Sequence, residues 1–182
     1  MFYIFTGLKH CGKTSLGRAA ASELHYSFFD LDQLVLDLSP NKWKSVRELW
    51  MNSGREEFLR LEELAAQNFI RLTLPSLEGR GVILSLGGGS IENDGALHWL
   101  RGPGLRVYIR AEANLLFQRI MAKGRPPFLS EDAPEKDFSV LYQKRDKLYR
   151  KFADIIHDVD NSPREINTQR LLKTLEAYHA GK

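Results

Sequence analysis

The sequence predicts an α/β fold in which helices cover both faces of a parallel β-sheet. Three observations lead to this prediction. Short apolar segments alternate with helical patterns, one of these segments is apolar throughout, and a glycine-rich motif joins the first of them to a helix. Such alternation is typical of doubly wound sheets with right-handed crossovers. The length of 182 residues fits a single domain over residues 1–182.

Each expected element follows from its local pattern. Apolar runs predict five strands, at residues 2–6, 27–29, 81–86, 105–109 and 155–157. Apolar residues at helical spacing predict helices at residues 15–24, 31–38, 46–51, 55–72, 94–100, 112–122, 138–152 and 164–180. The fourth helix should end at Pro75. Residues 124–134 are rich in proline and lack a hydrophobic period, so they predict a loop.

The glycine-rich motif, GLKHCGKT at residues 7–14, matches G-x-x-x-x-G-K-[ST]. Gly7 and Gly12 let the backbone curl so that its N–H groups face an anion. Lys13 would contact the β- and γ-phosphates, and the Thr14 hydroxyl would bind Mg²⁺. The positive end of the helix that begins at Ser15 favours the same anion. The motif therefore predicts nucleotide binding.

Two further groups follow expected strands. Asp30 and Asp32 are two residues apart, so on an extended segment their carboxylates would point the same way. One can hold Mg²⁺ through water while the other faces an acceptor hydroxyl as orienting group or base; capping of the next helix is the alternative role. Gly87, Gly88 and Gly89 bring bare amides within reach of a ligand. Ligands in such folds gather at the carboxyl ends of strands, so these groups should converge with the motif.

The loop at residues 124–134 contains Arg125. A loop of this kind can act as a lid that closes over the site and presents the guanidinium to the transferring phosphoryl group. Arg125 is a candidate catalytic residue because it occurs in one chain with the phosphate-binding motif, the aspartate pair and the triple glycine.

Composition narrows the classes of partner. The chain has 26 Lys and Arg against 23 Asp and Glu, a formal charge of +3, which is too mild to indicate nucleic-acid binding. No apolar run approaches the ~20 residues needed to cross a membrane. The motif begins at residue 7, so we expect no signal peptide and a cytoplasmic location. The single cysteine, Cys11, excludes an intramolecular disulfide.

The ordered set of motifs resembles the shikimate kinases, within the nucleoside-monophosphate-kinase-like group, over nearly the whole chain. It comprises residues 7–14, 29–32, Phe58 with Glu62, and residues 84–89, 125–127 and 145–149. The resemblance implies a three-layer sandwich with a five-stranded parallel sheet of order 2-3-1-4-5, a P-loop kinase fold. It also implies an acceptor-binding region at residues 30–62 and a lid at residues 123–136. The implied reaction moves the γ-phosphate of ATP to a ring hydroxyl of shikimate, a step of aromatic amino acid biosynthesis, and we expect a monomer.

The resemblance also implies roles for single residues. Asp30 would lie on the Mg²⁺ side, and Asp32 would contact the acceptor hydroxyls. Arg125 would be the lid arginine and Arg145 the arginine that grips the substrate carboxylate. Gly87, Gly88 and Gly89 would line the acceptor and γ-phosphate site, whereas Arg119 and the turn Asn161-Ser162-Pro163 would border the adenine.

Two positions depart from the family pattern. Leu59 occupies the place of an arginine that forms a second clamp on the shikimate carboxylate, and Leu36 replaces a glutamate four residues after Asp32. Arg60 is rotated by ~100° from the vacant place, whereas Arg55 is one turn before Leu59, ~6 Å away at Cβ. We therefore hypothesise that Arg55 and Arg145 together hold an acceptor carboxylate.

Other functions stay open on this basis. Leu59 can instead mark a kinase for a different small hydroxylated acceptor. The two departures are also compatible with a non-catalytic nucleotide-binding module that regulates a partner. A nucleic-acid kinase would need a basic stripe larger than residues 144–151.

Overall fold

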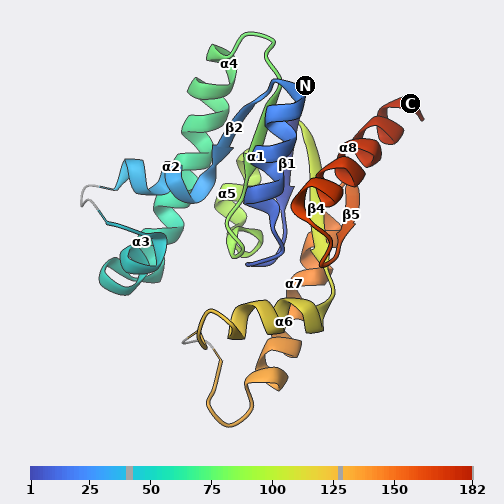
Figure 1. Ribbon diagram of the computed structural model, residues 1–182. Helices are drawn as coiled ribbons and strands as arrows, with labels where there is room; N and C mark the ends of the chain where they lie inside the picture. The colour runs from blue at the N-terminus through green and yellow to red at the C-terminus, as the bar shows by residue number, and fades with distance from the viewer. Residues whose placement is uncertain (40–42, 127–128, 182) are drawn as a thin grey trace.

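A computed structural model describes residues 1–39, 43–126 and 129–181 of the chain. Its five-stranded parallel sheet has the order β2-β3-β1-β4-β5, which confirms the predicted fold class and strand order (Figure 1). The strands are β1 (Phe2–Thr6), β2 (Ser27–Asp30), β3 (Val82–Ser85), β4 (Leu105–Ala111) and β5 (Ile155–Val159). The expected strands lie within two residues of these bounds.

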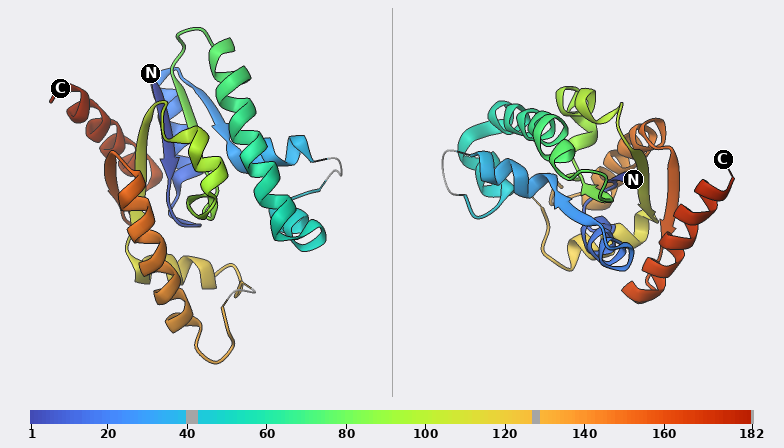
Figure 2. Two further views of the ribbon diagram at one scale, coloured as in Figure 1. Left: turned by 180° about the vertical axis from the view of Figure 1, so that it is seen from behind. Right: turned by 90° about the horizontal axis from the view of Figure 1, so that it is seen from above.

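Helices cover both faces of the sheet (Figure 2). On one face, α1 (Lys13–Leu24) packs beside α8 (Arg164–Ala180). On the other face lie α5 (Asp94–Leu100), α7 (Pro134–Phe152) and the second half of α3 (Val46–Asn68). The central strands are therefore sealed on both sides, and all four residues of β3 are buried. This burial explains why the first three residues of β3 are all apolar rather than alternating with polar ones.

Helix α2 (Leu31–Leu38) and the first half of α3 project from the sheet edge at β2, and they span most of the region predicted to bind an acceptor (Figure 1). The sequence predicted two helices here, separated at residues 52–54. The structure instead has one helix with a kink at Gly54, where φ is 81° and ψ is 173°. Glycine tolerates this backbone conformation, so the chain changes direction without a loop.

The same helix was predicted to run to residue 72 and to be stopped by Pro75, which is wrong because helical turns continue through Pro75 to Ser76. A π-helical turn, η1 (Phe69–Thr73), continues into a short turn, α4 (Leu74–Ser76). Proline is tolerated in the first turn of a helix because no intrahelical partner needs its missing N–H group.

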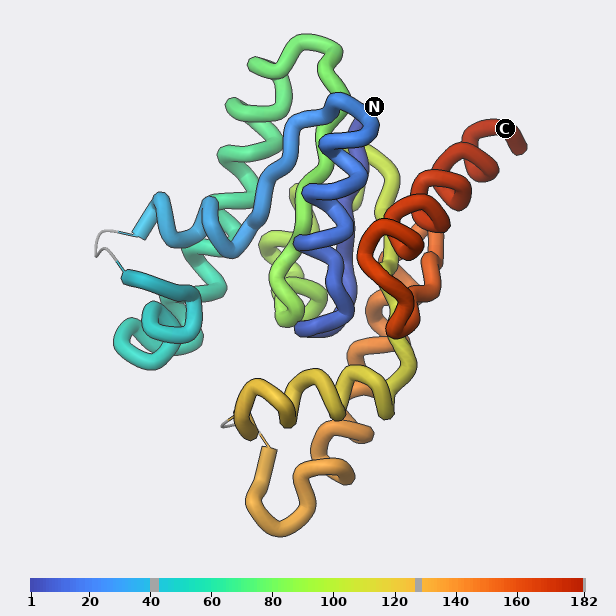
Figure 3. The backbone as a smooth tube through the Cα atoms, viewed as in Figure 1, coloured from blue at the N-terminus to red at the C-terminus, as the bar shows by residue number. Residues whose placement is uncertain are grey.

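The loop predicted to act as a lid connects α6 (Ala113–Met121) to α7 (Figure 3). Helix α7 begins four residues before the predicted start at Phe138, because Pro134 is favoured in the first helical turn and Glu135 and Asp137 suit its positive end. Residues 127–128 of the predicted lid lie outside the described residues. None of the helices in the described part of the chain combines the length and apolar character needed to cross a bilayer.

Candidate active site

The phosphate loop connects β1 to α1 at the carboxyl edge of the sheet. Gly7 and Gly12 both have positive φ angles, of 149° and 95°. A Cβ at Gly7 would also collide with the carbonyl oxygen of Ile109. The loop is closed by a hydrogen bond from the Cys11 N–H to the Leu8 carbonyl (3.2 Å), and Lys13 begins α1 with only 8% of its surface exposed. The sequence motif therefore has the backbone geometry of an anion cradle.

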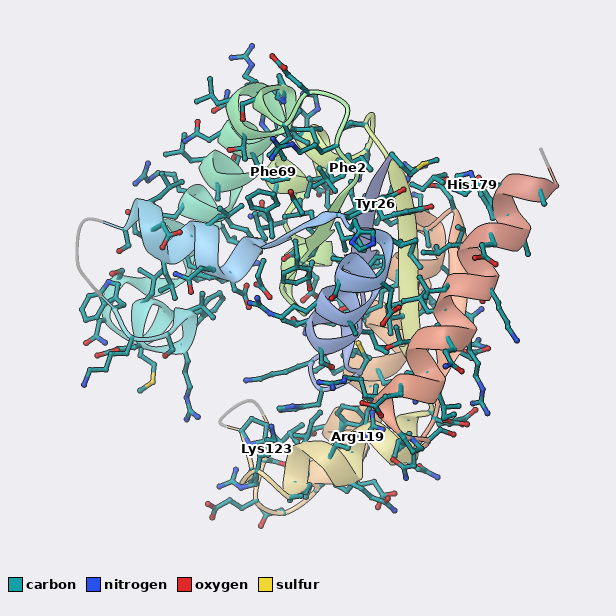
Figure 4. The ribbon with its side chains drawn as sticks, turned by 45° about the horizontal axis from the view of Figure 1, so that its top comes forward. Phe2, Tyr26, Phe69, Arg119, Lys123 and His179 are labelled. Carbon is teal, nitrogen blue, oxygen red and sulfur yellow. The ribbon has the colours of Figure 1, made fainter. Side chains whose placement is uncertain are left out.

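A cavity of about 770 Å³ adjoins this loop. Its lining includes Gly12, Lys13, Thr14 and Ser15, together with residues at the end of α6 and at the turn before α8. Figure 4 labels Arg119 and Lys123, which contribute to this lining from α6 and the residues just after it.

Arg119 ties two walls of the cavity together. Its guanidinium donates to the carbonyl oxygen of His10 (3.3 Å) in the phosphate loop, to the carbonyl of Asp160 (3.1 Å) and to the side chain of Asn161 (3.0 Å). Ser162 and Arg164, on either side of Pro163, also line the cavity. The turn at residues 161–163 and Arg119 thus border the same space beside the phosphate loop.

Three side-chain oxygens meet where β2, β3 and α1 come together. The Thr14 hydroxyl donates to the Asp30 carboxylate (3.1 Å) and lies 3.3 Å from the hydroxyl of Ser85. Mg²⁺ prefers oxygen ligands and uses one or two carboxylates plus substrate phosphates, so this set fits the ion. Ser85, buried at the end of β3, was not among the predicted site residues. Ser85 is the one polar side chain in the otherwise apolar run at residues 81–86, just before the glycine loop. This exception to the pattern is a signal that could have identified it.

Asp30 and Asp32 come close together for a reason other than the predicted one. Asp30 is the N-cap of α2 and accepts a hydrogen bond from the Asp32 N–H (3.1 Å), so Asp32 lies in the first helical turn rather than on an extended segment. Helix capping and contact with Thr14 are therefore simultaneous roles of one carboxylate. Each of its two oxygens serves one of them.

Asp32 lies against the triple-glycine loop. A Cβ at Gly87 would be 2.5 Å from Oδ1 of Asp32, so only glycine lets the carboxylate occupy this position. Burial raises the pKa of the Asp32 carboxyl above its usual value, and the neighbouring charge of Asp30 adds to this increase, while Lys13 and Lys9 oppose it. A carboxylate with a raised pKa is a better proton acceptor, which suits a general base.

The rest of the glycine loop packs on the phosphate loop and α7. A Cβ at Gly88 would be 2.9 Å from the backbone nitrogen of Lys9. The Gly88 carbonyl accepts hydrogen bonds from Tyr149 (2.7 Å) and from Nη1 of Arg145 (3.1 Å). Tyr149 is fully buried. The structure thus brings Arg145 to the glycine loop, 57 residues away in the sequence.

A hydrogen-bonded group of Glu62, Ser90 and Asn93 lies beside Leu59. Glu62 is buried and accepts hydrogen bonds from the Ser90 hydroxyl and from Nδ2 of Asn93 (2.8 Å), and Asn93 also donates to the Leu59 carbonyl (3.0 Å). Burial raises the pKa of Glu62. Ser90 and Asn93 were not predicted, and they link the end of the glycine loop to α3.

Among the described residues, two predicted arginines form no hydrogen bond or ion pair with the phosphate loop. Arg55 is exposed, directly after the kink at Gly54, and makes no hydrogen bond or ion pair with the described residues. Arg125 donates to the carbonyl of Leu129 and to the carboxylate of Glu131, so its guanidinium is held within the loop after α6.

Comparison with known proteins identifies the family to which this fold and these motifs belong. The family model for shikimate kinase matches residues 9–176. The chain belongs to the shikimate kinase family. Membership confirms the resemblance seen in the sequence, and it makes this chain an ATP-dependent small-molecule kinase. A purely regulatory module and a nucleic-acid kinase are accordingly not favoured.

Relatives within the shikimate kinase family span nearly the whole chain. The shikimate kinase of Caldanaerobacter subterraneus is 29% identical over 170 residues, which is 93% of each protein. That of Cupriavidus pinatubonensis is 34% identical over 153 residues, 84% of this chain and 74% of the relative.

Solved structures of shikimate kinases have the same fold. The enzyme from Bacteroides thetaiotaomicron has a TM-score of 0.74 at 29% identity, covering 97% of this chain and 98% of that chain. A shikimate kinase from Acinetobacter baumannii in complex with shikimate has a TM-score of 0.80 at 22% identity. The match covers 97% of this chain and 93% of that chain.

Proposed function

We propose that the protein transfers the γ-phosphate of ATP to a hydroxyl group of shikimate, giving shikimate 3-phosphate and ADP in aromatic amino acid biosynthesis. The observation that carries this proposal is the position of Asp32. Its carboxylate lies against Gly87 at the same sheet edge where Thr14 meets Asp30. On this proposal, the pair that holds the metal ion and the carboxylate that accepts the proton lie side by side.

The nucleotide would be held by the walls of the cavity beside the phosphate loop. Gly7, Gly12, Lys13 and Ser15 would bind the phosphates, and Arg119 and Pro163 would border the adenine. Thr14 and Asp30 would hold Mg²⁺, which supplies charge neutralisation on the β- and γ-phosphates. Lys13 is nearly buried, so its charge acts in a medium that screens it less than water does.

The acceptor would bind between Asp32, Gly87–Gly89 and Arg145. Asp32 would accept the proton of the acceptor hydroxyl as its oxygen attacks the γ-phosphorus. The bond from that phosphorus to the bridging β–γ oxygen breaks, and ADP leaves. Arg145 would bind the acceptor carboxylate from its position at Gly88. Arg55 would complete the clamp that Leu59 leaves open, which requires its exposed side chain to turn toward the site.

The loop after α6 would close as a lid over the nucleotide. On closure, Arg125 would exchange its contacts with Leu129 and Glu131 for the transferring phosphoryl group. An arginine at this place stabilises the charge that spreads over the phosphoryl oxygens in the transition state. Closure also excludes water, which would otherwise compete with the acceptor. A cytoplasmic location and a monomeric state are part of the same proposal.

ADP release tests the proposed reaction directly. Purified protein with ATP and Mg²⁺ should release ADP rapidly when shikimate is present and slowly when it is absent, and mass spectrometry should detect the phosphorylated acceptor. Lys13→Met serves as the inactive control. A panel of hydroxy acids and polyols should give lower kcat/KM values than shikimate. If one of them exceeds shikimate, Leu59 marks a changed acceptor, and if none yields ADP above background, the kinase assignment fails.

A further inference from the structure

Glu92 holds the guanidinium of Arg145 at the edge of the glycine loop. Nε and Nη2 of Arg145 both donate to Oε2 of Glu92, at 3.0 and 2.7 Å. The third contact of Arg145 is its Nη1 bond to the carbonyl of Gly88 (3.1 Å). The side chains of Arg145 and Glu92 are only 20% and 23% exposed, so this is a partly buried ion pair rather than a mobile surface one.

These contacts use part of the hydrogen-bonding capacity of Arg145. A guanidinium carries five N–H donors. Glu92 accepts one donor from Nε and one from Nη2, and Gly88 accepts one from Nη1. Within the described part of the chain, this leaves one donor on each terminal nitrogen without a partner. A carboxylate can accept two such donors together, which is the strongest mode of arginine–carboxylate recognition.

The charge of Glu92 is balanced by a second cation. Nζ of Lys144 lies 2.6 Å from the other oxygen of Glu92. Burial acts to raise the pKa of Glu92, but hydrogen bonds from Lys144 and Arg145 outweigh it and hold the pKa below its usual range. Glu92 is therefore ionised at neutral pH. Lys144, Arg145 and Glu92 together carry one net positive charge. This charge favours the binding of an anionic acceptor at Arg145.

We propose that Glu92 is a positioning residue: it orients Arg145 so that the two remaining guanidinium donors face the carboxylate of the acceptor. The inference rests on the proposed function, because it takes the acceptor to be a hydroxy acid bound by Arg145. Without Glu92, Arg145 keeps its charge but loses two of the three hydrogen bonds that order it. Binding the acceptor would then include the entropic cost of ordering this side chain.

Steady-state kinetics of Glu92→Ala and Glu92→Gln test the proposal with two acceptors, shikimate and its methyl ester. Glu92→Ala should raise KM for shikimate by ~10-fold while kcat changes by less than ~3-fold. Glu92→Gln keeps an acceptor oxygen and should lie between wild type and Glu92→Ala. For the methyl ester, which lacks the carboxylate, neither variant should change KM. In an Arg145→Ala background, Glu92→Ala should add no further change.

Asp94→Asn is the matched control. It removes a negative charge two residues along the chain, from an exposed ion pair with Arg101, and should leave KM for shikimate as in wild type.

The outcomes separate the two levels of the proposal. If wild-type protein does not phosphorylate shikimate, the proposed function itself fails. If wild type is active and Glu92→Ala has an unchanged or lower KM, the positioning role is overturned while the function stands. An equal rise of KM for shikimate and for the ester also overturns it, because Glu92 would then support the pocket in general rather than the carboxylate contact.

Discussion

The hydroxyl of Thr14 donates a hydrogen bond to the carboxylate of Asp30 across 3.1 Å, although 16 residues separate them in the sequence. Thr14 belongs to the first turn of α1, and Asp30 ends β2. The contact forms because β1 and β2 are both parallel partners of β3, so their carboxyl ends lie at one edge of the sheet. Each segment thereby brings to the phosphate loop one of the two side chains that we propose as Mg²⁺ ligands.

Asp30→Asn should weaken the use of Mg²⁺ without unfolding α2. Asparagine is as good an N-cap as aspartate, so the hydrogen bond to the Asp32 N–H can remain while the negative charge is lost. We expect the Mg²⁺ concentration for half-maximal activity to rise by ~10-fold or more at saturating ATP. Asp37→Asn, which removes an exposed charge from the same helix, is the control. An unchanged Mg²⁺ titration would remove Asp30 from the metal site.

Gly87→Ala should displace the proposed base. The new methyl group would lie 2.5 Å from Oδ1 of Asp32 and 3.0 Å from the Ser90 hydroxyl, so the carboxylate must move. A displacement of about 1 Å can lower the rate by ~10²-fold, and we expect kcat to fall by that order. Gly102→Ala meets no atom within 4 Å and should retain wild-type kcat. Equal kcat values for the two variants would contradict the proposed role of Asp32.

The pH profile of kcat/KM should reflect the raised pKa of Asp32. Because the base must be deprotonated, activity should be lost on the acid side at a pH above the ordinary aspartate pKa of about 4. Lys9 lowers this pKa, so Lys9→Met should move the acid limb to higher pH. Lys173→Met, an exposed lysine of α8, should leave the limb in place. An acid limb that moves to lower pH in Lys9→Met would refute this assignment.

Loss of Arg145 or Arg55 should weaken acceptor binding if both hold its carboxylate. Removing one charge-assisted contact costs about 1.5–3 kcal/mol, so each alanine variant should raise KM for shikimate by ~10- to 150-fold. Arg60→Ala, from the exposed pair with Glu57 on the same helix, should not. A wild-type KM in Arg55→Ala would leave Arg145 as the only clamp of the two.

The sequence by itself determined the sheet, the helices and the phosphate loop, because their signals are local. A glycine motif between a strand and a helix needs no distant partner, and the period of apolar residues reports burial directly. The predicted bounds of α5 and α8 agree with the structure for this reason. The strand order came from the family resemblance, since several right-handed arrangements satisfy the same local patterns.

Only the tertiary structure decided which side chains meet. Ser90 reaches Glu62 across 28 residues, and Tyr149 reaches Gly88 across 61. Glu92 carries no motif of its own, and its pairing with Arg145 depends on how α7 packs against the glycine loop. The kink at Gly54 likewise depends on packing, because a glycine permits a turn but does not require one. Contacts between distant segments depend on the packing of whole elements, and local sequence does not encode that packing.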